Sequence, residues 1–106
     1  MDFPAEKGSF KVKSTNKVAS KLYISIAGEN ADAEINGANI IVALYEKGTG
    51  KLVSAHIPYV WDTKNCQILN TTLELSGMKD YSADLYDVKV MAIGDNLTPI
   101  GEAASF

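Results

Sequence analysis

The chain has 106 residues, of which 46% are hydrophobic and 22% are charged, and its net charge is -3. This length and balance fit one folded domain and exclude a disordered chain, which would be poorer in apolar residues. All 10 basic residues are lysines, so the chain lacks the arginines that bind phosphate and guanine, and we expect no nucleic-acid partner.

Apolar residues alternate with polar ones in most segments, which is the spacing of strands with one buried face. In chain order, we expect strands at about residues 10–13, 22–27, 40–45, 52–57, 67–75, 86–92 and 100–106. Residues 1–8 are expected to form a loose leader, and residues 9–106 a single domain. Seven short strands predict an all-β fold of two antiparallel sheets, because the two inner faces can then cover each other.

Two of these segments make sharper predictions. The segment 40–45 is apolar on both faces, which predicts a central strand that is buried on both sides, and Gly48 and Gly50 after it favour a hairpin turn. In the segment 86–92, alternation predicts that Val88 and Val90 lie in the core and that Lys89 is exposed. No segment has the roughly 20 consecutive apolar residues that a membrane span requires.

The segment 86–92 reads Tyr-Asp-Val-Lys-Val-Met-Ala, and this Tyr-x-Val-x-Val-x-Ala pattern resembles the sixth strand of fibronectin type III and related bacterial immunoglobulin-like modules. Segments 41–45, 50–53 and 97–100 are similar to sandwich repeats of secreted and cell-wall proteins of Gram-positive bacteria. The resemblance implies an immunoglobulin- or fibronectin III-like sandwich of about seven strands. Two features depart from it. Segment 22–27 has no tryptophan, and the only tryptophan, Trp61, is expected in a loop. The leucine-to-tyrosine spacing of the family's corner is met by Leu75 and Tyr81, but the strand pattern follows Tyr86, which implies an insertion of about five residues.

What the resemblance implies about function is a non-catalytic spacer or adhesion module of a larger exported protein. Such a module would be extracellular or on the cell surface, with neighbouring domains of the same polypeptide, or a surface protein, as partners. No catalytic residues and no cofactors follow from the resemblance. An N-terminal signal peptide is not apparent in residues 1–6, so we expect any export signal to lie outside this sequence.

A binding alternative rests on the segment 58–65, where two large aromatic residues stand beside hydrogen-bonding groups. In a carbohydrate-binding module, Tyr59 and Trp61, together with Tyr81, would form a platform on which sugar rings of a polysaccharide stack, with Asp62 and Asn65 as polar contacts. Alternatively, Trp61 plugs one end of the core, because its large apolar surface carries one polar group. The first interpretation predicts a partly exposed Trp61, and the second predicts a buried one.

A catalytic alternative needs a nucleophile beside a base, and only His56 and Cys66 offer that combination here. The nine residues between them permit contact in a β-meander. The structural interpretation makes His56 a solvent-facing strand residue and Cys66 a small residue in a loop or at a strand end. We expect the structural interpretation to hold and the protein not to be an enzyme.

The acidic segment 29–37 places oxygen-bearing side chains at every second position before Gly37, as a calcium loop does at its start. Counting from Asp32, the bidentate glutamate required at the twelfth position of an EF-hand would be Ala43, so that motif fails. A looser calcium site between strand ends remains an alternative. We expect no tight metal site.

Overall fold

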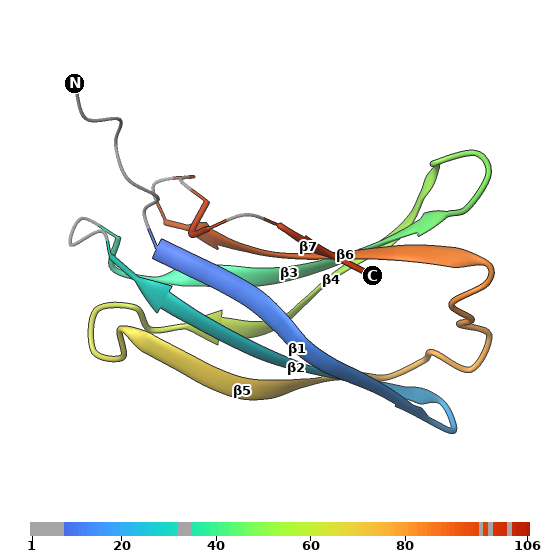
Figure 1. Ribbon diagram of the computed structural model, residues 1–106, viewed down its shortest axis with the longest axis horizontal. Helices are drawn as coiled ribbons and strands as arrows, with labels where there is room; N and C mark the ends of the chain where they lie inside the picture. The colour runs from blue at the N-terminus through green and yellow to red at the C-terminus, as the bar shows by residue number, and fades with distance from the viewer. Residues whose placement is uncertain (1–7, 32–34, 96, 98, 102) are drawn as a thin grey trace.

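The computed structural model describes residues 8–31, 35–95, 97, 99–101 and 103–106. Within them the chain forms two antiparallel sheets stacked on each other, with strand orders β1-β2-β5 and β4-β3-β6-β7 (Figure 1). The strands are β1 (Gly8–Val18), β2 (Lys21–Asn30), β3 (Ala38–Glu46), β4 (Leu52–Trp61), β5 (Ile68–Leu75), β6 (Tyr86–Gly94) and β7 (Ala104–Ser105). The predicted all-β sandwich is confirmed. The described part of the chain contains no helix with the length and hydrophobicity needed to cross a bilayer.

The core is built from alternate residues of both sheets, as expected when the inner face of each sheet covers the other. Ile24 of β2 and Val42 of β3 are fully buried, and so are Val88 and Val90 of β6. Lys89 between them is exposed. The predicted faces of β6 are therefore correct.

The two chain ends differ from the predicted boundaries. Gly8, assigned above to the leader, is buried and opens β1 opposite Asn30, where a Cβ atom would lie 2.0 Å from the carbonyl oxygen of Glu29. The rest of the predicted leader lies outside the described residues. At the other end β7 is shorter than expected, because Gly101, with a φ of 71°, turns the chain between Ile100 and the strand.

The hairpin from β3 to β4 turns where predicted, with Gly48 at a φ of 91° and Gly50 at 70°. β4 pairs with β3 alone and forms one edge of its sheet. The pairing register shifts twice along it, at Ile40/Val42 and at Leu44/Tyr45, and each shift places an extra residue on β4. These bulges decide which β4 side chains face inward.

Candidate functional site

Trp61 is the last residue of β4 rather than a loop residue, and 0% of its surface is exposed. It pairs with buried Ala38, so its side chain points into the sandwich. The indole Nε1 donates a hydrogen bond of 2.6 Å to the carbonyl oxygen of Cys66, which satisfies the one polar group of the ring. Trp61 therefore plugs the core, and the predicted aromatic platform is wrong for this residue because no face of the ring reaches solvent.

The other residues predicted for that platform lie on β4, in the turn after it and in the segment that joins β5 to β6. Asn65 donates from its side-chain amide and its backbone N–H to the Asp62 carboxylate, at 2.9 and 3.3 Å, and these bonds tie the turn after β4. The side-chain hydrogen bond from Asn65 is the main reason why the pKa of Asp62 lies below its usual value. Tyr59 is 38% exposed at the sheet edge, whereas Tyr81 stacks on Tyr86 with ring centroids 6.2 Å apart.

His56 and Cys66 do not form a catalytic pair. His56 is half-buried in the middle of β4, where its Nε2 lies 3.2 Å from Ser54 Oγ, so it is not the solvent-facing residue predicted above. Cys66 is exposed in the loop after β4, where its carbonyl oxygen bonds to Trp61. Trp61 lies five positions after His56 on β4, which corresponds to roughly 17 Å of extended chain. The strand geometry therefore keeps thiol and imidazole apart.

The inward side of β4 at His56 opens into a groove of about 240 Å³ between β4 and the loop that joins β5 to β6. Ser54, Asp80, Tyr81 and Met78 line it together with His56. A serine hydrolase would need a carboxylate bonded to the histidine, and among the described residues Asp80 makes no hydrogen bond with His56. The groove thus lies at the sheet edge, beside the small side chain of Ser54.

The acidic segment is described only at its two ends. Glu29 is exposed, and the buried Asn30 donates its amide to the carbonyl oxygen of Ile35 at 3.4 Å. Asp32 and Glu34, the acids of the alternative calcium site, lie outside the described residues. In the ranges that are described, no group of three or more His, Cys, Asp or Glu side chains could hold a metal ion.

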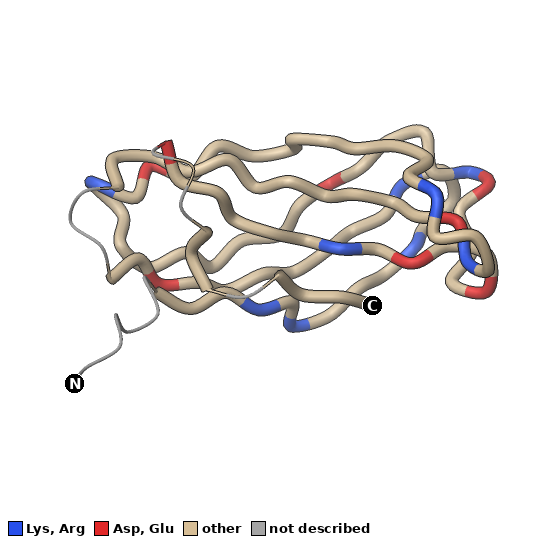
Figure 2. The backbone as a smooth tube through the Cα atoms, turned by 90° about the horizontal axis from the view of Figure 1, so that it is seen from above, with Lys and Arg blue, Asp and Glu red and all other residues tan. Residues whose placement is uncertain are grey.

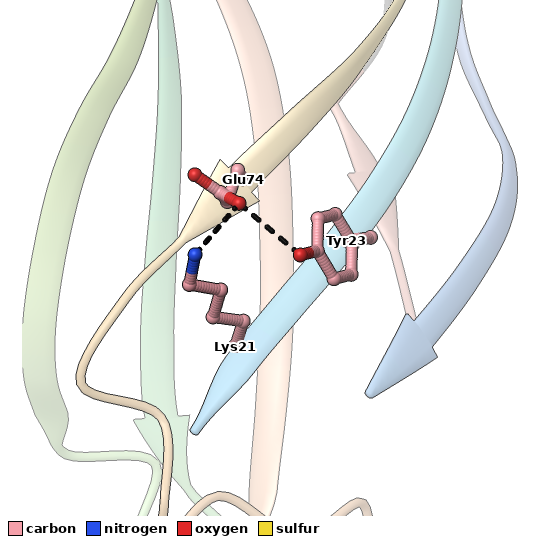
Figure 3. Close-up of polar contacts among 3 residues, drawn as sticks. All are labelled: Lys21, Tyr23 and Glu74. Carbon is pink, nitrogen blue, oxygen red and sulfur yellow. Dashed lines mark hydrogen bonds and ion pairs between the residues drawn. The ribbon is translucent and has the colours of Figure 1, made fainter. Parts of the chain in front are cut away.

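The outer face of the three-stranded sheet is polar. Glu74 of β5 accepts hydrogen bonds from Lys21 Nζ at 3.2 Å and from Tyr23 Oη at 3.1 Å, both on β2 (Figure 3). Ser25 and Thr72 face each other on the same two strands, with their hydroxyl oxygens 3.1 Å apart. This side of the molecule is suited to solvent.

The outer face of the four-stranded sheet has the opposite character. Cross-strand pairs set its rows: Val60 with Asn39 and Ile93, and Ala55 with Ala43. We call the following residues the outer apolar face: Ile41, Ala43, Tyr45, Leu52, Ala55, Ile57, Val60, Met91 and Ile93. Leu52, Ile57 and Val60 are 52%, 58% and 66% exposed. Figure 2 shows the molecule from above, with charged residues most numerous at its two ends and a few midway along the strands.

The sequence contains a signal for this face. Residues 40–45 are apolar on both sides and were predicted to be buried on both. β3 is indeed central, between β4 and β6, but Ile41 and Tyr45 are only half-buried because no third layer of the described residues covers the outside of the sheet. Met91 and Ile93 on the neighbouring strand show the same alternation and the same partial exposure.

No protein-family model matches the chain, and no curated protein is found to match it either. The class of protein is therefore defined here by the fold and its two outer faces. In the part of the chain that the structure describes, the protein is a two-sheet antiparallel β sandwich of seven strands, with one polar outer face and one apolar outer face.

Proposed function

We propose that this chain is a non-catalytic interaction module of a larger exported protein and that it contacts a protein partner through the outer apolar face. The observation that supports this is the contrast between the two outer faces. Isolated apolar residues on a surface need no explanation, but a contiguous apolar patch of several hundred Å² is typical of interaction sites. The polar outer face of the other sheet is what solvent exposure alone would favour.

The energetics point the same way. Burial of apolar surface contributes roughly 25 cal/mol per Å², so covering Ile57 and Val60, which are largely exposed, is favourable. The resemblance to fibronectin type III and bacterial immunoglobulin-like modules agrees with a spacer or adhesion role beside neighbouring domains. The alternative of a carbohydrate-binding module depended on an exposed Trp61, and that ring is buried.

Hydrophobic-interaction chromatography at low protein concentration tests whether the outer apolar face is adhesive. Ile57→Lys places a charge on that face, and Thr72→Lys places the same charge on the polar outer face of the other sheet. We expect Ile57→Lys to elute clearly earlier than wild type and Thr72→Lys to elute close to it. If the two variants elute alike, the outer apolar face is not an adhesive surface and the proposal is wrong.

A further inference from the structure

The outward side chains along β6 have an ordered polarity. Lys89, Met91 and Ile93 point outward, opposite Ala43, Ile41 and Asn39 of β3. The backbone N–H of the next outward residue, Asp95, donates to the carbonyl oxygen of Gly37 at 2.8 Å, which extends this ladder past the end of β6. The row begins at Asp87, opposite Tyr45, and then runs from Lys89 through two apolar residues to Asp95.

Lys89 and Asp95 flank the two apolar residues of this row. Among the described residues, neither Lys89 nor Asp95 has an ion-pair partner, and Lys89 Nζ lies 5.4 Å from the centroid of the Tyr45 ring. The adjacent strands β3 and β4 contain no lysine, aspartate or glutamate within residues 38–45 and 52–61. Asp87, further along β6, is paired with Lys47 at 3.7 Å.

The segment from Lys89 to Asp95 is complementary to a second copy of itself that runs in the opposite direction. If two outer apolar faces stack about a twofold axis with their β6 strands antiparallel, Lys89 of each copy meets Asp95 of the other, and Met91 meets Ile93. Every contact then occurs twice, as in all interfaces with twofold symmetry. A parallel arrangement would instead bring the two Lys89 side chains to the same level.

We propose that the partner of the outer apolar face is a second copy of this chain, in a dimer with that antiparallel geometry. The proposal deepens the proposed function and rests on it. It also accounts for the placement of Lys89 and Asp95, because each desolvated charge finds a partner across the interface.

The size of the face is sufficient for a dimer of modest affinity. β3 and β6 have nine residues each, which is roughly 30 Å of strand, and four strands roughly 4.8 Å apart give a flat area on the order of 500 Å². Side chains roughen this area, and stable interfaces begin at about 600 Å² of accessible surface per partner. Because the whole face is needed to reach that size, we expect monomer and dimer to exchange with concentration.

Pairing through the free edge of β4 is the competing way to join two copies. The two bulges bend this edge, and Pro58 has no backbone N–H to donate to a partner strand. Bulges and prolines at a sheet edge oppose strand addition. Stacking of the outer apolar faces leaves this edge unpaired and so avoids the obstacle.

Sedimentation velocity from about 1 μM to about 1 mM, with circular dichroism as a check of folding, tests the dimer. We expect wild type to dimerise over this range. Lys89→Asp and Asp95→Lys each create two like-charge contacts and should weaken the dimer by about tenfold or more. The double variant restores both attractions and should dimerise like wild type, and an equal mixture of the two single variants should form heterodimers. Glu74→Lys, on the other sheet, should leave the dimer unchanged.

Three results would overturn the dimer. Wild type that stays monomeric at the highest concentration would do so, as would single variants that associate as tightly as wild type. A dimer that is lost with Ala55→Pro on the edge strand but tolerates both charge reversals would indicate edge pairing instead.

If wild type is monomeric while Ile57→Lys still elutes early from the hydrophobic column, the second-copy inference fails and the interaction module stands. If wild type is monomeric and the hydrophobic column also fails to separate Ile57→Lys from Thr72→Lys, both the second-copy inference and the interaction module are wrong.

Discussion

The indole of Trp61 on β4 lies against Gly28 of β2, across the interior of the sandwich. A Cβ atom at Gly28 would be 3.4 Å from Cη2 of Trp61 and 3.0 Å from the carbonyl oxygen of Ser9. The absence of a side chain on β2 thus makes the space that the largest side chain of β4 fills. The two sheets are joined here by packing, at the end where the chain turns from β4 toward β5.

Removal of the indole should be costly. We expect Trp61→Ala to lower the free energy of unfolding by about 3–5 kcal/mol, because it leaves a cavity between the sheets. Trp61→Phe should keep part of the packing but lose the hydrogen bond to Cys66, a net contribution of about 1 kcal/mol. Urea unfolding measures both. In the folded wild type, emission from Trp61 should be blue-shifted and poorly quenched by acrylamide, and strong quenching would contradict the buried position.

The alternation along β6 predicts unequal effects at adjacent positions. Val88→Ala should destabilise the fold by about 1–3 kcal/mol, since it removes two buried methyl groups and leaves a small cavity. Lys89→Ala on the opposite face should change the free energy of unfolding by less than about 0.5 kcal/mol, measured below the concentration at which the chain associates. Equal losses at the two positions would mean that the faces of β6 are assigned wrongly.

Two glycines with nearly the same backbone angle should respond differently to alanine. Gly101 has a φ of 71° and Gly77 a φ of 73°, but a Cβ atom at Gly101 would lie 2.7 Å from the backbone nitrogen of Phe10, whereas one at Gly77 meets nothing within 4 Å. Gly77→Ala should cost about 1 kcal/mol from backbone strain alone. Gly101→Ala should cost clearly more in thermal and urea unfolding, and similar losses would argue against the close approach of residues 9–10 to Gly101.

The polar outer face predicts a measurable shift in acid titration. The hydrogen bonds from Lys21 and then Tyr23 to Glu74 hold the pKa of that carboxyl below its usual value (Figure 3). Because the folded pKa is lower than the unfolded one, the pair stabilises the fold above the unfolded pKa, and this contribution is lost as the pH falls through the folded pKa. In NMR titration, Lys21→Met should raise the pKa of Glu74 more than Tyr23→Phe does. A pKa that is the same in wild type and Lys21→Met would show that the contact does not persist in solution.

Alternation and turn glycines were enough to predict the strands and the two-sheet arrangement, because side chains on a strand alternate regardless of what the sheet packs against. The inward side of β4 was less predictable. Its bulges arise from pairing with β3, and they place Ser54 and His56 inward while Ile57 faces outward. Alternation also groups Ile41 with Met91 on one face without saying whether another layer covers that face. The role of Trp61 depended on Gly28, a contact between strands distant in sequence.

The hydrogen bond between Trp61 and Cys66 joins the only tryptophan of the chain to its only cysteine. The indole is enclosed, while the thiol, which donates to the carbonyl oxygen of Ile68 at 2.9 Å, lies at the surface. A small acceptor dye attached to Cys66 would thus sit beside the intrinsic donor in the native state and move away from it when β4 separates from the loop. Energy transfer between these two natural positions would report the opening of this end of the sandwich in the otherwise unmodified protein.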